Sequence, residues 1–319
     1  MEYLIGVDGG GTRTTCVAAL PDGQVVRRAV GLGINYNNIG MDEARNRLHD
    51  TVSALLTDDA SIGGMCIGMS ALDYAADEET TRLFCGSCFD PAATDMQSDA
   101  FTALMGYTLG KPGMIIICGT GSMMLMIDKN GKETVTGGWG HILGDPGSSH
   151  QIAMDGLRRA INHWEGVSPA PAIAEAAQKH FALSFPRQLI EKVFHPDCTN
   201  ATIAQFAKEV LILAAEGDKD ALDILKKNMT HCAMEAAALL KDAPESANIG
   251  LHGGVFTHNP LARELFTAAI QELVPHARTG MALYPPEIGA LIHLFAKKGL
   301  LTDHVLHNLK ESYDKLQNA

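Results

Sequence analysis

Two short turns rich in glycine and threonine follow strongly apolar segments of the chain. The first, residues 9–12 (GGGT), comes directly after YLIGVD, and the second, residues 119–122 (GTGS), follows MIIIC. Glycines let a backbone approach an anion closely, and main-chain amides and threonine hydroxyls donate hydrogen bonds to its oxygens. The composition of both turns therefore predicts phosphate binding.

The elements around the first turn distinguish it from two common nucleotide sites. Residues 13–20 and 24–30 read as strands separated by the turn signal PDG at 21–23, so the glycines lie within a hairpin. A dinucleotide fold instead has its glycines between a strand and a helix. The patterns G-x-G-x-x-G and G-x-x-x-x-G-K-[ST] are both absent from the turn.

The second turn repeats the layout of the first. Residues 123–128 (MMLMID), a KNGK turn and the segment ETVTGG follow it, and Thr120 precedes Asn130-Gly131 by the spacing that separates Thr12 from Asp22-Gly23. This pattern predicts a duplicated architecture. We expect helices near 42–57, 77–86, 100–110 and through most of 150–241, another strand near 247–256, and helices at 260–274, 286–298 and the C-terminal tail.

The composition excludes several classes of protein. A chain of 319 residues with 46% hydrophobic content favours two domains, and a net charge of -12 gives no basic footprint for nucleic acid. No apolar run long enough to span a membrane and no signal peptide is apparent, so we expect a cytoplasmic protein. Seven scattered cysteines indicate a reducing compartment; the CGSC pair, Cys85 and Cys88, is interpreted as two ordinary thiols, with a redox pair as the alternative.

Four segments together resemble one family: VDGGGTRTT, IICGTGS, GGWGHILGDPGSSHQIA (137–153) and LHGGVF (251–256). They are similar to the BadF/BadG-type ATPases of the actin-like ATPase superfamily, and within them to N-acetylglucosamine kinases. The resemblance covers nearly the whole chain and implies an α/β fold of two actin-like, ribonuclease H-like domains around a central cleft. The domains expected are residues 1–113 and 114–286, with the helix at about 287–319 packing back on the first.

The resemblance also implies an ATP-dependent kinase that phosphorylates the 6-hydroxyl of N-acetylglucosamine. Asp8 would hold Mg²⁺ through water, as hard cations prefer oxygen ligands. Asp99 would be the general base. The implied ATP contacts are Gly10, Thr12, Gly119, Thr120, Gly121, Ala204, Gly253 and Gly254. The implied sugar contacts are Asn35, Asp99, Ser122, Gly138, Trp139, Gly140 and Asp145.

Each polar candidate also has a purely structural interpretation. Asp99 stands where an N-cap is common, and Asp145 lies in GDPG, a favourable turn sequence. Asn35 lies in a loop rich in glycine and asparagine, Trp139 could belong to a core, and His141 is expected to be a hydrogen-bonded structural residue.

Other substrates and activities stay open. Glucosamine and N-acetylmuramic acid are the alternative sugars, because Met123 and Ser70-Ala71 depart from the kinase pattern. An activator ATPase of the same family would carry a cysteine after the second turn, and residues 119–197 contain none. The resemblance implies a homodimer that binds ATP and an amino sugar, without nucleic acid or membrane.

Overall fold

The computed structural model describes residues 1–57 and 59–317. The chain divides into two compact units, Met1–Ile115 with Ala282–Ala319 (the first unit) and Ile116–Met281 (the second unit). The helix elements within the described residues include none long and apolar enough to cross a bilayer.

The first unit is built on a five-stranded sheet of order β3-β2-β1-β4-β5. Its strands are β1 (Glu2–Gly9), β2 (Arg13–Ala19), β3 (Val25–Leu32), β4 (Ser61–Met69) and β5 (Thr94–Ser98). Its helices are α1 (Tyr36–Ile39), α2 (Met41–Ser53), α3 (Glu78–Cys85), α4 (Asp99–Thr108), α14 (Pro286–Lys297) and α15 (Asp303–Gln317), with a 3₁₀ turn at Pro91–Ala93. The strands β1, β2 and β3 are antiparallel neighbours, whereas β4 and β5 run parallel to β1.

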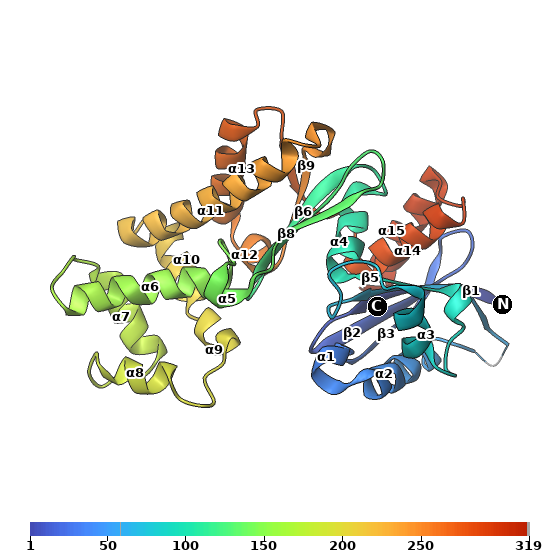
Figure 1. Cartoon of the computed structure of the whole chain (residues 1–319), viewed down its shortest axis with the longest axis horizontal. Helices are drawn as coiled ribbons and strands as arrows, with labels where there is room; N and C mark the ends of the chain where they lie inside the picture. The colour runs from blue at the N-terminus through green and yellow to red at the C-terminus, as the bar shows by residue number, and fades with distance from the viewer. Residues whose placement is uncertain (58, 318–319) are drawn as a thin grey trace. The chain divides into compact units, whose positions relative to one another are not determined.

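Alternating side chains of β1 cover both faces of this sheet, as expected for a strand buried on each side. Ile5 and Val7 join a core with Leu48 of α2, while Leu4 joins a second core with Leu291 of α14. Figure 1 shows α2 and α14 on opposite faces of these strands. The apolar face of α15 belongs to the second core, which confirms that the tail packs on the body of the protein.

The second sheet has the order β10-β9-β6-β7-β8. Its strands are β6 (Gly113–Cys118), β7 (Ser122–Ile127), β8 (Glu133–Gly137), β9 (Asn248–His252) and β10 (Arg278–Met281). Read from β8, this order repeats the first sheet strand for strand. The predicted duplication is thus confirmed, and with it the α/β fold with two mixed sheets of the actin-like kind.

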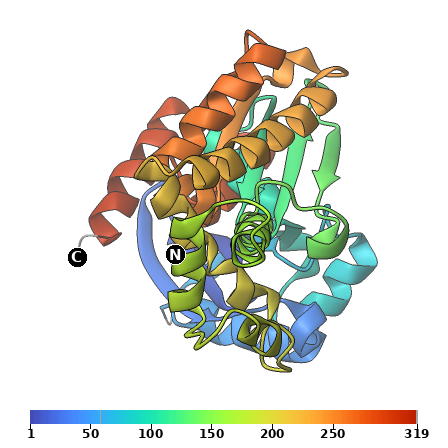
Figure 2. The ribbon, with the colours of Figure 1, turned by 90° about the vertical axis from the view of Figure 1, so that its left-hand side faces the viewer.

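Most helices of the second unit pack against one another. They are α5 (Gly140–Leu143), α6 (Ser149–Trp164), α7 (Pro171–His180), α8 (Gln188–Val193), α9 (Asn200–Ala204), α10 (Ala207–Ala215), α11 (Lys219–Leu240), α12 (Gly254–His258) and α13 (Pro260–Leu273), with a 3₁₀ turn at Pro244–Ser246. Figure 2 faces this unit and shows α11 and α13 side by side.

Several elements differ from the sequence prediction. The helix expected over 201–216 is broken between α9 and α10, and the segment expected as one strand over 247–256 is the strand β9 followed by α12. The strands β5 (TDMQS) and β10 (RTGM) were not predicted, because they are short and carry no alternation of apolar and polar residues.

Candidate functional site

The first glycine turn is a tight connection between β1 and β2. The amide of Gly10 donates to the carbonyl of Arg13 at 3.0 Å, and a Cβ at Gly10 would lie 2.9 Å from that oxygen. Gly10 therefore has little room for a side chain. Thr12 and Gly11 are exposed at the tip of the turn. The turn thus presents backbone and a threonine hydroxyl at the surface of the first unit.

Parallel strands bring the other polar residues of the first unit to the same edge of the sheet. Asp8 of β1 pairs with Gly68 of β4, and Met69 of β4 pairs with Ser98 of β5. The carboxyl ends of these strands therefore coincide, which is where α/β proteins bind ligands. Asp99 follows directly at the start of α4.

Asp8 lies in a negatively charged and largely desolvated environment. Burial raises the pKa of its carboxyl group to about 7, and the charges of Glu287 and Asp99 add to this rise, while Arg13 opposes it. Burial and the two negative charges disfavour the ionised form of the carboxyl group, whereas the positive charge of Arg13 favours it. A cation beside Asp8 would offset this accumulation of negative charge.

Asp99 is free of the capping role that its sequence position suggested. The N-cap of α4 is Ser98, whose Oγ accepts from the amide of Phe101 at 3.1 Å, and Asp99 is the first helical residue. The interpretation of Asp99 as an N-cap is therefore wrong. Burial raises the pKa of the Asp99 carboxyl and Asp73 adds to the rise, although the amide of Ala100 acts in the opposite direction.

Asn35 is held beside the first turn by backbone hydrogen bonds. The amides of Gly33 and Ile34 donate to the carbonyls of Thr12 and Gly10 at 3.0 and 3.1 Å. The side chain of Asn35 accepts from the amide of Asn37, so it does cap α1. Its Nδ2 also donates to Ser70 Oγ at 3.1 Å. The Asn35 side chain thus caps α1 and also lies near the first glycine turn.

The second turn is fastened to the start of α6. The amides of Ser149 and His150 donate to the carbonyls of Gly119 and Thr120 at 2.8 and 3.3 Å. Within the turn, the Gly119 amide donates to the Gly121 carbonyl at 2.9 Å. These bonds fix the backbone conformation at the end of β6.

Asp145 contacts the second turn and has an unsatisfied oxygen. Its backbone has φ 64°, a left-handed conformation that is uncommon for a residue other than glycine. A Cβ at Gly121 would lie 2.8 Å from Asp145 Oδ2. The residue is 5% exposed, and Oδ1 has no hydrogen-bond partner among the described residues. Buried polar atoms without partners are rare, and this oxygen is available to accept a hydrogen bond.

Ser122 and Gly138 lie close to Asp145, whereas Trp139 projects away from the core. Ser122 Oγ donates to the carbonyl of Pro146 at 2.8 Å, and the Gly138 amide donates to the Ser122 carbonyl at 2.9 Å. Trp139 is 73% exposed, beside Gly140 at the start of α5. The interpretation of Trp139 as a core residue is therefore wrong. His141 makes the expected hydrogen bond, with its Nδ1 2.9 Å from Asn200 Nδ2.

The third glycine turn, at the end of β9, meets the end of β6. Gly253 has φ 90°, and a Cβ there would lie 2.4 Å from the Cys118 carbonyl oxygen. Gly254, at the start of α12, faces open space. The strands β6 and β9 are neighbours in the sheet, so this contact joins the second and third turns.

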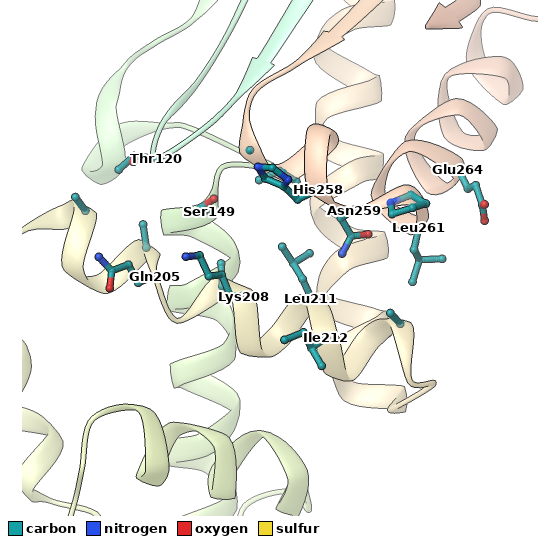
Figure 3. Close-up of a pocket in the computed structure, with 17 residues that line it drawn as sticks. Thr120, Ser149, Gln205, Lys208, Leu211, Ile212, His258, Asn259, Leu261 and Glu264 are labelled. Carbon is teal, nitrogen blue, oxygen red and sulfur yellow. The ribbon is translucent and has the colours of Figure 1, made fainter. Parts of the chain in front are cut away.

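A pocket of about 840 Å³ opens beside these turns, within the size range of ligand pockets. Thr120, Ala204 and Gly254 are among its lining residues, whereas Gly119, Gly121 and Gly253 are not. Figure 3 shows Thr120 and Ser149 at one side of the pocket and Leu261 and Glu264 at the other. The pocket thus unites three of the predicted nucleotide contacts with residues of α10, α12 and α13.

Three residues of these sites were not predicted from the sequence. Glu287 is 5% exposed, accepts from the Tyr313 hydroxyl, and is the largest source of negative charge acting on Asp8. His150 is buried, its Nδ1 lacks a partner among the described residues, and burial lowers the pKa of its imidazole. Lys208 lines the pocket. Of the three, only Glu287 had a signal in the sequence, because it is an acidic residue within the apolar segment PPEIGALI.

No group of three His, Cys, Asp or Glu side chains within 1–57 and 59–317 is arranged to hold a metal ion by itself. All seven cysteines are free thiols, and Cys85 is buried while Cys88 is partly buried.

Comparison with known proteins gives relatives along almost the whole chain. The chain is 28% identical to an N-acetyl-D-glucosamine kinase of Dictyostelium discoideum, over 93% of this chain and 99% of the relative. It is 25% identical to an N-acetylmuramic acid/N-acetylglucosamine kinase of Clostridium acetobutylicum, over 76% of this chain and 80% of the relative.

A solved structure from Chromobacterium violaceum, provisionally named an N-acetylglucosamine kinase, has a similar fold. It superposes with a TM-score of 0.73 at 22% identity and covers 92% of this chain and 98% of its own. The family described as the BadF/BadG/BcrA/BcrD ATPase family matches residues 5–294. The chain therefore belongs to the BadF/BadG/BcrA/BcrD ATPase family.

Proposed function

We propose that the protein is an ATP-dependent kinase that transfers a phosphoryl group to the 6-hydroxyl of N-acetylglucosamine. The observation that carries the proposal is Asp99, a partly buried carboxylate at the carboxyl end of the parallel strands that is not the N-cap of its helix. The Dictyostelium relative, similar over nearly its whole length, bears the name of this activity.

Asp99 is proposed as the general base. Phosphoryl transfer depends mainly on positioning and on neutralising charge, and it also needs an acceptor oxygen that can lose its proton. Burial raises the pKa of Asp99 above the usual range for aspartate, which makes the carboxylate a better proton acceptor. Asp99 would take the proton of the sugar hydroxyl as that oxygen attacks the terminal phosphorus.

The three glycine turns are proposed to bind ATP. The proposed phosphate contacts are Gly10 and Thr12 of the first turn and Gly119, Thr120 and Gly121 of the second turn. Ala204, Gly253 and Gly254 would lie toward the nucleoside. The pocket beside Thr120, Ala204 and Gly254 supports the assignment, because its volume suits a nucleotide-sized ligand.

Mg²⁺ is proposed to accompany ATP, with Asp8 as the residue that holds it through water. The residues present fit such an ion. Burial and two neighbouring acids raise the pKa of the Asp8 carboxyl, and a cation would offset the cost of ionising it. The absence of a three-ligand cluster in the described residues agrees with Mg²⁺ that keeps water and phosphate ligands. When bound, the ion would neutralise charge on the phosphates.

The sugar contacts are proposed as the resemblance implies them. The proposed contacts are Asn35, Asp99, Ser122, Gly138, Trp139, Gly140 and Asp145. Asp145 has the strongest support, since its unpartnered Oδ1 could accept from a sugar hydroxyl after a small movement. Trp139 supports the acetylated sugar through its exposed ring, which is available for contact with an apolar group.

The family resemblance is the basis for the proposed quaternary structure, and the scattered cysteines are the basis for the proposed compartment. We propose a homodimer located in the cytoplasm, with domains corresponding to residues 1–113 and 114–286 and the C-terminal helix returning to the first.

A coupled assay of ADP release with Mg-ATP tests the function. N-acetylglucosamine should raise ADP release far above the rate without sugar, and glucosamine, N-acetylmuramic acid and glucose should give lower kcat/KM. Preference for N-acetylmuramic acid or glucosamine would replace the substrate but keep the kinase. A rate that no sugar changes would instead favour an activator ATPase.

A further inference from the structure

The pocket of the second unit contains very little positive charge for a site that should receive a nucleotide. Lys208 is the one lysine or arginine among the 17 described residues that line it, and Glu264 is the one acid. The whole chain carries a formal charge of -12, so its long-range field repels a polyphosphate. Any attraction for phosphate in this pocket must therefore come from local groups.

The helix α10 directs Lys208 into the pocket. Lys208, Leu211, Ile212 and Ala215 follow the i, i+3, i+4, i+7 spacing of one helical face, and all four line the pocket. The opposite side of the chain is anchored by Phe206, which is fully buried and stacks edge-on against His180. This anchoring fixes which face of α10 borders the pocket.

The charge of the Lys208 side chain is not used in an ion pair recorded for the described residues. The side chain is exposed and takes part in no ion pair or side-chain hydrogen bond recorded for the described residues. Its aliphatic stem can lie along the alanines of the pocket wall while the ammonium group reaches polar ligand atoms. In Figure 3 Lys208 lies below Ser149 and next to Leu211.

The rest of the pocket offers the base only weak recognition. None of its 17 lining residues is Phe, Tyr or Trp, and the side away from Thr120 is formed largely by aliphatic side chains such as Leu211, Ile212 and Leu261. The imidazole of His258 is then the one ring among these 17 residues on which a base could stack. We therefore expect the phosphates to supply a larger share of the nucleotide affinity.

We propose that Lys208 binds a phosphate group of the nucleotide that is not transferred, and so makes the pocket select adenosine diphosphate and triphosphate over adenosine. The inference rests on the proposed function, because it assumes that this pocket receives ATP. Lysine serves as a point charge for phosphate, and its ammonium donates charge-assisted hydrogen bonds. Lys208 thus complements the uncharged donors of the second turn.

Calorimetric titration of the full chain with ADP and with adenosine tests the proposal. In Lys208→Ala the dissociation constant for ADP should rise about 10-fold, as expected for a partly exposed charge-assisted contact. The constant for adenosine should stay within about twofold, because the lost group contacts only phosphate. Lys208→Arg should retain most of the ADP affinity.

Lys226→Ala is the matched control. Lys226 is an exposed lysine of α11 that does not line the pocket, so this variant removes the same charge elsewhere in the second unit. Equal weakening of ADP by both variants would overturn the proposal in favour of a long-range field. Equal weakening of ADP and adenosine in Lys208→Ala would assign the effect to packing, and unchanged ADP binding would also refute the proposal. Failure of the unaltered protein to bind ADP would refute the proposed function instead.

Discussion

Two adjacent glycines of the third turn should respond very differently to the same substitution. Gly253 has φ 90°, and an added Cβ would lie 2.4 Å from the Cys118 carbonyl oxygen and 2.6 Å from its carbon. These are backbone atoms at the end of β6, which cannot rotate away. Gly254 begins α12 and would place a Cβ in open space. Gly253→Ala should destabilise the second unit, and Gly254→Ala should not.

The magnitude follows from two costs. A side chain held at this φ costs about 1–3 kcal/mol, and displacing packed atoms costs about 1–3 kcal/mol more. The free energy of unfolding should therefore fall by roughly 2–6 kcal/mol, or about 4–24 °C in Tm for a unit of this size. Gly254→Ala should be neutral or stabilising by up to about 1 kcal/mol, because alanine restricts the unfolded chain.

Urea unfolding followed by circular dichroism measures both effects, and ADP titration gives a second readout. Gly253→Ala should also weaken ADP binding, because Cys118 immediately precedes the second turn, which we propose to bind phosphate. Equal midpoints for Gly253→Ala and Gly254→Ala would refute the reasoning, since the two variants differ only in the space and conformation available to the same methyl group.

Three further predictions concern the first unit. Asp99→Asn should keep sugar binding by calorimetry but lose turnover by a factor of about 10²–10⁴ or more, as expected for removal of a general base; near-normal turnover would contradict the base role. The raised pKa of Asp99 means that the ionised base is lost as pH falls through a value above the ordinary aspartate pKa of 3.8. The acid limb of kcat/KM for sugar at saturating Mg-ATP should therefore lie above that value, and a limb at or below it would disagree. Gly289→Ala should lower the urea midpoint through a loss of about 1–3 kcal/mol or more, because its Cβ would lie 1.9 Å from the Thr102 carbonyl oxygen; an unchanged midpoint would show that α14 and α4 can separate freely.

Local patterns in the sequence predicted much of the fold. The two hairpins were recognisable because their apolar strands, glycine turns and Asx-Gly turns recur in the same order, and the two sheets confirm that duplication. The strand β5 was missed because TDMQS has no alternating pattern, although it determines where Asp99 lies. The break between α9 and α10 was missed because residues 201–216 have continuous helical character.

Tertiary contacts explain why parts of the candidate site escaped prediction. Glu287 acts on Asp8 from a segment almost 280 positions away in sequence, and no local pattern connects them. The left-handed backbone of Asp145, its unpartnered oxygen and its proximity to Gly121 depend on the folded chain and have no counterpart in a local sequence pattern. Lys208 gains its significance from the pocket around it, because the sequence alone presents it as one exposed lysine of a helix.

The central claim is transfer of phosphate from ATP to the 6-hydroxyl of N-acetylglucosamine. Proton-coupled ³¹P NMR of the products formed from Mg-ATP and N-acetylglucosamine tests it most directly, because the phosphorus couples to the protons on the carbon that bears it. The account predicts one sugar phosphate whose phosphorus couples to the two C6 protons. Coupling to any other ring proton would contradict the proposed position, and inorganic phosphate alone would contradict the kinase.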